Sequence, residues 1–163
     1  MSDTKDLSLK MATEQDVPII LSFIKALAEY ERLADAVIAT EEGLRQTLFG
    51  PRPYAECVIA RWQGQPAGFA LFFHNYSTFL GRPGIYLEDL FVKPELRGQG
   101  VGRALLQFLA RLTQERKCGR LEWSVLDWNE SAIGFYKSLG AIPLDDWTIF
   151  RVKDEALSRL AGH

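Results

Sequence analysis

The sequence predicts an α/β fold with a mixed sheet. Near the N-terminus, apolar residues recur at three- and four-residue spacing, which is typical of an amphipathic helix. Two strand-like runs then flank residues 63–66 (QGQP), a turn sequence that predicts an antiparallel hairpin. Farther along the chain, strand-like and helix-like runs alternate, which is typical of helices that cross over between strands.

The N-terminal elements follow from local signals. A short strand is expected at residues 7–11. Residues 13–16 (TEQD) have the pattern of a capping box in its Asp form, and Pro18 suits the first turn of a helix. The apolar stripe of that helix continues as far as Tyr30 and Glu31.

A second helix and a run of strands should come next. The helix is expected from residue 40 to residue 50, where a Gly-Pro pair stops it. Residues 55–62 and 67–73 form the predicted hairpin, and the polar residues 74–84 are expected to be a loop.

The C-terminal half alternates between strands and helices. Pro94 ends a strand because proline has no N–H to donate to the ladder. Gly140 suits the position after the end of a helix. The expected elements are strand 85–92, helix 101–117, strand 120–126, a helix from residue 129 or 131 to residue 140, and strands 141–144 and 148–152.

Composition limits the class of protein. The 163 residues are 47% hydrophobic and 25% charged, which predicts a single globular domain over residues 1–163. The formal net charge of −2 provides no overall basic field, so we expect no nucleic-acid or membrane partner. A small-molecule partner is expected instead.

Cysteine, histidine and the N-terminus give further expectations. Cys57 and Cys118 are far apart in the sequence and form no disulfide framework or C-x-x-C site, which favours reduced thiols in the cytoplasm. The polar N-terminus has no apolar segment of a secretory signal. His74 and His163 are too isolated to indicate a metal site.

The glycine-rich residues 98–102 lie between a predicted strand and a predicted helix. The first backbone N–H groups of a helix have no intrahelical partners, and the helix dipole is positive at this end. Glycines allow a bulky anion to approach the backbone, and Arg97 and Arg103 can add charge-assisted hydrogen bonds. The junction therefore predicts an anion site.

Other anion-binding motifs fit this junction poorly. A P-loop requires Lys followed by Ser or Thr, and a dinucleotide fingerprint requires G-x-G-x-x-G, whereas the spacing here is G-x-G-x-G. A simple connecting turn is the structural alternative. Residues 97–102 (RGQGVG) instead match R-x-x-G-x-G, so the sequence resembles the acyl-CoA pyrophosphate signature of the GNAT acetyltransferases.

The resemblance covers nearly the whole chain. The strings KALAEYERL, YLEDLFVKPELRGQGVG and WNESAIGFYKSLGA look like the spermidine/spermine (diamine) branch of the superfamily, including its thialysine-acetylating relatives. The resemblance implies the GNAT fold, a mostly antiparallel sheet flanked by helices and split between two central parallel strands. It also implies acetyl-CoA as co-substrate and a homodimer with substrate bound near the subunit boundary.

The resemblance also assigns residues to acetyl-CoA. The backbone of residues 90–92 would hold the pantetheine arm, with an N–H near Val92 polarising the thioester carbonyl. Asn129 would bind the pantetheine or phosphate end, although capping a helix is an equally good role for it. The implied cofactor-binding residues are Leu90, Phe91, Val92, Arg97, Gly98, Gln99, Gly100, Val101, Gly102, Arg103, Asn129 and Tyr136.

Acetyl transfer to an amine also needs a proton acceptor and a proton donor. By resemblance, Tyr136 would protonate the leaving thiolate and Glu88 would accept the amine proton, directly or through a water. The alternative for Tyr136 is a core aromatic residue. Asp89, with Tyr30 and Glu31, would line the acceptor pocket. Because Glu88 and Asp89 are adjacent in a strand, they face opposite sides of the sheet unless a bulge intervenes.

The sequence thus predicts a metal-independent N-acetyltransferase. The acceptor is expected to be a primary amine of a small diamine, a polyamine or a lysine-like substrate, attacked directly in a ternary complex. Two alternatives stay open: a protein N-acetyltransferase, and an acyl-CoA-binding module without turnover.

Overall fold

A computed structural model describes residues 6–163. These residues divide into two compact units, one ending at Ser124 and the other beginning at Val125. None of the helices in this part of the chain is long and apolar enough to cross a membrane. The first unit contains β1 (Leu7–Met11), η1 (Glu14–Asp16), α1 (Val17–Tyr30), η2 (Ala34–Ala36), α2 (Glu41–Phe49), β2 (Glu56–Trp62), β3 (Gln65–Ser77), β4 (Arg82–Val92), η3 (Pro94–Leu96), α3 (Val101–Glu115) and β5 (Leu121–Trp123).

The sheet of the first unit has the predicted mixed topology. Its five strands lie in the order β1-β2-β3-β4-β5, and every neighbouring pair is antiparallel except β4 and β5, which are parallel. The parallel ladder joins Ile85 through Leu87 to Leu121 through Trp123. Strand β4 continues from there to Val92, so residues 88–92 extend beyond the ladder with β5.

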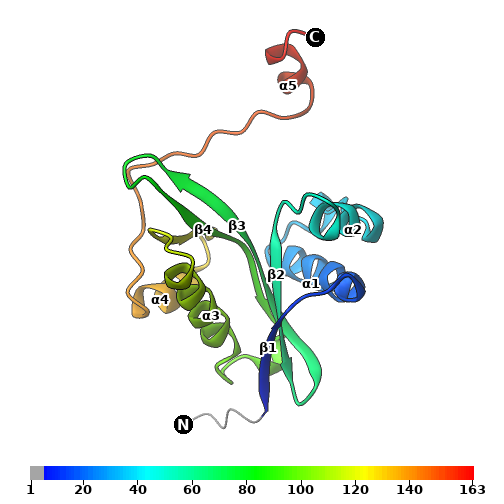
Figure 1. The fold of residues 1–163 in the computed structure, drawn as a ribbon, viewed down its shortest axis with the longest axis vertical. Coiled ribbons are helices and arrows are strands. Elements are labelled where there is room, and N and C mark those ends of the chain that lie inside the picture. Colours follow the sequence, from blue (N-terminus) through cyan, green and yellow to red (C-terminus); the bar gives the residue numbers. More distant parts are fainter. Residues whose placement is uncertain (1–5) are drawn as a thin grey trace. The chain divides into compact units, whose positions relative to one another are not determined.

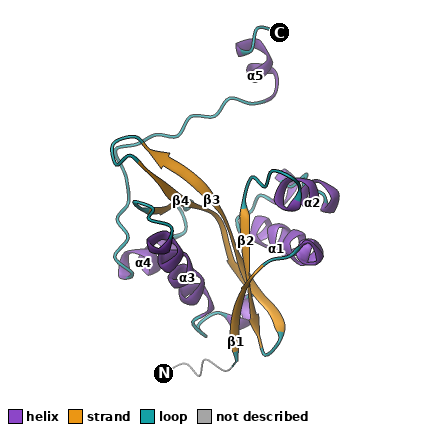
Figure 2. Cartoon of the chain, in the orientation of Figure 1, coloured by secondary structure: helices purple, strands orange, loops and turns teal. Residues whose placement is uncertain are grey.

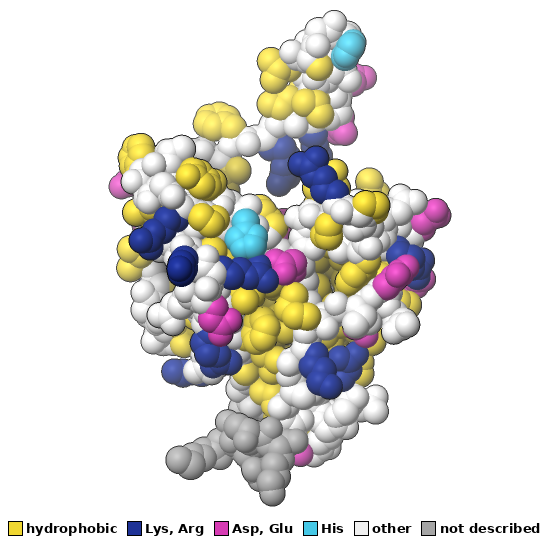
Figure 3. All heavy atoms as spheres, in the orientation of Figure 1, with side chains coloured by type: hydrophobic (Ala, Val, Ile, Leu, Met, Phe, Trp, Pro, Cys, Tyr) yellow, Lys and Arg dark blue, Asp and Glu magenta, His cyan; other side chains and the backbone are white. Residues whose placement is uncertain are grey.

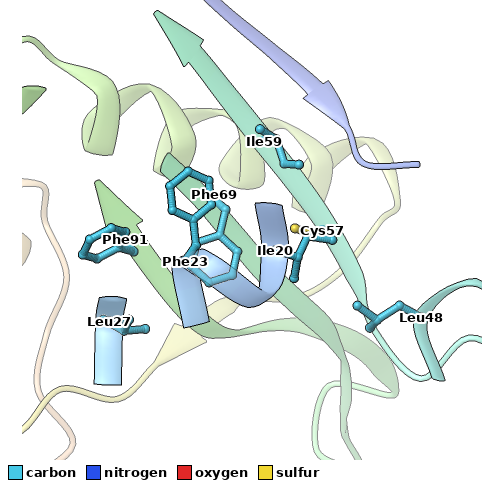
Figure 4. Close-up of a cluster of buried hydrophobic side chains, with 8 residues drawn as sticks. All are labelled: Ile20, Phe23, Leu27, Leu48, Cys57, Ile59, Phe69 and Phe91. Atoms are coloured by element: carbon cyan, nitrogen blue, oxygen red, sulfur yellow. The ribbon is translucent and has the colours of Figure 1, made fainter. Parts of the chain in front are cut away.

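Helices cover both faces of this sheet. Figure 1 shows α1 and α2 on one face and α3 on the other. On the first face, Phe23 of α1 packs between Phe69 of β3 and Phe91 of β4, at ring-centroid distances of 5.4 and 5.9 Å (Figure 4). This packing fixes α1 against β4 where β4 continues past β5.

The beginnings of the helices confirm the capping signals. The backbone N–H of Thr13 donates to the Asp16 carboxylate at 2.8 Å, which is half of the predicted capping box. The other Asp16 oxygen accepts from Arg61 of β2 at 3.0 Å. The side-chain oxygen of Thr40 accepts from the Gly43 N–H at 3.0 Å and caps α2.

The far end of α3 is also fixed to the sheet. Arg116, which follows the last residue of α3, donates through both Nη atoms to the two oxygens of Glu56 in β2, at 2.6 and 2.8 Å. A bidentate pair of this kind has a defined geometry. Together with the buried stripe of α3, it holds the helix in one orientation over the sheet.

The hairpin of β3 and β4 is longer than expected. The predicted loop over residues 74–84 is wrong, because the ladder continues to the pair Ser77 and Arg82. A contact between the rings of Phe73 and Tyr86, 5.3 Å apart, supports this extension. Cross-strand pairing therefore outweighs the polar composition of this segment.

The second unit contains α4 (Glu130–Ser138) and α5 (Asp154–Leu160). Asn129 caps α4 by accepting from the Ala132 N–H at 3.3 Å, and Gly140 follows the helix with φ of 91°, as predicted. The expected strands 141–144 and 148–152 are wrong, since this segment is a loop without strand pairing (Figure 2). A run of residues with high β-propensity needs a neighbouring strand before it forms a ladder. The helix α5 was not predicted from the sequence.

Candidate functional site

The glycine-rich segment leads directly into α3. Gly98 and Gly100 have φ angles of 82° and 84°, in the left-handed region that favours glycine. The Ala104 N–H donates to the Gly100 carbonyl at 3.0 Å and closes the first turn of the helix. The N–H groups of residues 101–103 precede this bond and lie at the positive end of the helix dipole.

The space around this segment is open. A Cβ atom placed on Gly98 or Gly100 would meet no other atom within 4 Å, and one placed on Gly102 would meet only Val92 Cγ2 at 3.7 Å. Val101 is buried and anchors the start of α3 in the core. The segment therefore presents backbone donors on an accessible surface, which suits a phosphate group.

Arg97 lies between this segment and the end of α1. Its Cζ atom is 4.8 Å from the centroid of the Tyr30 ring, and its Nε donates to the Val92 carbonyl at 3.3 Å. The sequence predicted a cofactor role for Arg97 and an acceptor role for Tyr30. The structure brings these two residues into direct contact.

The bulge that the sequence left open is present in β4. Leu71 of β3 pairs with Asp89, but the next residue, Phe72, pairs with Leu87, so the register skips Glu88. This one-residue shift is the arrangement of a β-bulge. It changes which face the following residues occupy, and it releases Glu88 from strict alternation with Asp89.

Three carboxylates influence one another at this point. The pKa of Asp89 is raised to about 6, mainly by burial and in addition by the negative charges of Glu88 and Glu31. Burial also raises the pKa of Glu31, with an additional contribution from the charge of Glu88. The predicted acceptor residues Glu31, Glu88 and Asp89 are therefore close enough in the structure to interact electrostatically.

This carboxylate cluster is suited to a cation. Like charges held together favour protonation, and a bound cation relieves their repulsion. Tyr30, the last residue of α1, lies beside Glu31 in the chain and is partly exposed. On the face that Figure 3 shows, acidic and basic side chains are interspersed.

The predicted pantetheine-binding residues form the end of β4. Leu90, Phe91 and Val92 pair with β3 on one side, opposite Ala70, Phe69 and Gly68. On the other side they extend past the ladder with β5. Phe91 is buried against α1, so its contribution to a ligand would come from the backbone.

The remaining predicted residues belong to the second unit. Tyr136 lies in α4, is half-buried, and contacts the Phe135 ring at a centroid distance of 5.7 Å. The Asn129 side chain caps α4, which was its alternative role in the sequence analysis. Within residues 6–163, no group of three or more His, Cys, Asp and Glu side chains is arranged to hold a metal ion.

Residues 23–141 match the model of the Acetyltransferase (GNAT) family. The chain belongs to this family. It is therefore an acetyltransferase, and acetyl-CoA is the co-substrate of such enzymes. The match begins in the first unit and ends in the second.

Individual relatives agree with the predicted branch. This acetyltransferase is 41% identical to the thialysine N-epsilon-acetyltransferase of Bos taurus, over 94% of this chain and 96% of the relative. It is 31% identical to an L-ornithine N5-acetyltransferase of Arabidopsis thaliana, over 93% of this chain and 86% of the relative. The structure of an integron cassette protein from V. cholerae has a TM-score of 0.80 at 26% identity, covering 100% of this chain and 99% of that chain.

Sequence reasoning missed one feature of the site and left a second one open. The contact of Arg97 with Tyr30 joins residues far apart in the sequence, and no local pattern indicates it. The bulge at Glu88 was raised only as a possibility. The adjacent carboxylates in an apolar strand were a usable signal, because a regular strand would bury one of them on the wrong face.

Proposed function

We propose that this acetyltransferase acetylates a primary amine of a small diamine, a polyamine or a lysine-like amino acid. The observation that carries this proposal is the electrostatic interaction of Glu31 with Glu88 and Asp89 at the bulge of β4. A substrate with a second cationic group would bind these carboxylates while its reacting amine faces the thioester. The names of the relatives, which act on thialysine and L-ornithine, support the same substrate class.

The proposed position of acetyl-CoA follows the end of β4 and the start of α3. The pyrophosphate would accept hydrogen bonds from the backbone N–H groups of residues 98–102, with Arg97, Gln99 and Arg103 nearby. The pantetheine arm would extend along residues 90–92, whose edge lies beyond the ladder with β5. Asn129 would contribute from the start of α4, in addition to capping it.

The proposed reaction is a direct transfer in a ternary complex. The amine nitrogen attacks the thioester carbonyl, a C–N bond forms, and the C–S bond breaks. Glu88 takes the proton from the amine, directly or through a water, and Tyr136 protonates the departing thiolate. The N–H near Val92 stabilises the oxyanion in place of a metal ion, so treatment with a chelator should leave the rate unchanged.

A panel of amines tests the proposed substrate class. Release of the CoA thiol should be measured with thialysine, L-ornithine, spermidine, a monoamine and a lysine-containing peptide. We expect turnover with the small diamines and little with the monoamine, because the monoamine lacks the second cation. Faster turnover of the peptide than of every small amine would contradict the proposal.

We also propose that the chain forms a homodimer. The segment between α4 and α5 supports this, because several of its large apolar side chains are exposed; they are Ile142, Leu144, Trp147, Ile149, Phe150 and Val152. A second copy of this chain would cover such residues, which single domains rarely leave in water. Light scattering should give twice 18.4 kDa. A fully active monomer would contradict the dimer.

Two further proposals concern organisation and location. We propose that both units act as one catalytic domain, since the family match crosses the boundary at residue 124.

We also propose that the enzyme works in the cytoplasm. Cys57 and Cys118 support this location because both are free and buried thiols. Fractionation of cells that express a tagged chain would test it.

A further inference from the structure

Arg97 connects the ends of three elements. Its guanidinium lies over the ring of Tyr30, the last residue of α1, with Cζ 4.8 Å from the ring centroid. Its Nε donates to the carbonyl of Val92, the last residue of β4, at 3.3 Å. In the chain, Arg97 directly precedes residues 98–100, which lead into α3.

These two contacts fix the orientation of a planar group. The ring of Tyr30 lies under the Cζ atom of the guanidinium, and the Val92 carbonyl accepts a hydrogen bond from its Nε. A lysine at this position would keep the positive charge, but it has no planar guanidinium and no Nε that donates to Val92. The combination of a planar cation at the ring and an Nε hydrogen bond therefore requires arginine.

The contacts also act on the conformation of the glycine-rich segment. Gly98 and Gly100 have no side chains that could hold residues 98–100 in place, and both adopt left-handed φ angles. A flexible segment that must be ordered around an anion loses binding free energy to that ordering. Holding Arg97 at the start of the segment reduces this loss.

We propose that Tyr30 is a positioning residue that holds Arg97 and thereby raises the affinity of the enzyme for acetyl-CoA. A residue at the acceptor end of α1 would then control binding of the acetyl donor. The inference rests on the proposed position of acetyl-CoA at residues 98–102. It adds a second role to the expectation that Tyr30 lines the acceptor pocket.

Titration calorimetry with acetyl-CoA, in the absence of any amine, tests this inference on the full chain. Tyr30→Leu removes the aromatic ring and should weaken binding about two- to fivefold, the effect of one exposed cation–π contact. Tyr30→Phe keeps the ring and is the matched control, with Kd expected close to that of the parent. Arg97→Lys should weaken binding at least as much as Tyr30→Leu.

The double variant gives the decisive comparison. Tyr30→Leu and Arg97→Lys both remove the contact of the guanidinium with the Tyr30 ring, so the double variant should bind acetyl-CoA no more weakly than Arg97→Lys alone. Additive losses, or an unchanged Kd in Tyr30→Leu, would overturn the inference. So would a loss in Tyr30→Phe as large as that in Tyr30→Leu. Thermal unfolding of each variant reports whether the fold is intact.

A variant of the glycine-rich segment separates this inference from the proposed site. If Gly102→Glu weakens acetyl-CoA binding while Tyr30→Leu does not, the proposed position of acetyl-CoA stands and the role of Tyr30 is wrong. If neither substitution changes the Kd, the proposed position itself is wrong. Failure of the amine panel would affect neither measurement, because no amine is present.

Discussion

Asp89 of β4 lies opposite Leu71 of β3, and the register then skips Glu88 and pairs Leu87 with Phe72. Phe91, two residues after Asp89, packs on α1. Leu87 pairs with Phe72 of β3. The centroid of the Phe72 ring lies 6.0 Å from Cζ of Arg116, which follows α3. Because of the shift, Leu87 and Phe91 point to opposite faces although they are four residues apart, and Glu88 and Asp89 lie at the bulge near Glu31.

The pKa of Asp89 gives a prediction about stability and pH. Its value is raised from 3.8 to about 6, so the folded chain keeps a proton that the unfolded chain has already released in this range. The contribution of Asp89 to stability therefore falls as pH rises from about 4 to about 6. Relative to Asp89→Asn, the free energy of unfolding of the parent should fall over this range by less than about 3 kcal/mol. The fall is smaller than this limit because solvent screens the half-buried group.

Urea unfolding at a series of pH values measures this difference. Above about pH 6 the difference between the parent and Asp89→Asn should become constant. Asp35→Asn is a suitable control, since Asp35 is exposed in η2. A difference that stays flat from pH 4 to pH 7 would show that Asp89 is not desolvated.

Glu31 should discriminate between diamines and monoamines. Glu31→Gln removes one carboxylate that would hold the second cation, and the loss of a charged hydrogen bond raises the KM for a diamine about fivefold or more. The KM for a monoamine should not change. Steady-state kinetics with 1,3-diaminopropane and propylamine make the comparison, and equal effects on both would place Glu31 outside the acceptor pocket.

Gly102 tests the proposed pyrophosphate site with little risk to the fold. A Cβ at Gly102 has only an ordinary contact with Val92, whereas Gly100 needs its left-handed φ angle. Gly102→Glu places an obstructing side chain and a negative charge where the anion would bind, so the KM for acetyl-CoA should rise at least tenfold (about 1.4 kcal/mol). Gly102→Ala, which adds a Cβ atom without a charge or a long side chain, is the matched control. An unchanged KM in a folded Gly102→Glu variant would contradict this site.

Tyr136 tests the proposed general acid. Tyr136→Phe keeps the ring and its contact with Phe135 but removes the proton, so kcat should fall about 10²-fold with little change in the KM for acetyl-CoA. Phe135→Leu, which alters packing and not the hydroxyl, serves as the control. If kcat of Tyr136→Phe stays within about twofold of the parent, Tyr136 is a packing residue and the thiolate leaves without it.

The sequence by itself determined the features that depend on neighbours along the chain. Three such features are the capping box at Thr13, the glycine after α4 and the turn of the first hairpin, which was expected over residues 63–66 and is formed by residues 63 and 64. They are local, because each is set by backbone geometry over a few residues. The motif of residues 97–102 and the strings around it identified the family. The absent strands at 141–144 and 148–152 mark the limit of such patterns, since a strand also needs a partner.

Only the tertiary structure decided how the site is assembled in the first unit. The register between β3 and β4 depends on packing against α1 and α3, and it places the bulge at Glu88. The approach of Arg97 to Tyr30 depends on how α1 lies across the end of β4. These relationships arise from burial and pairing between distant segments, and a linear pattern of residues does not record which segments those are.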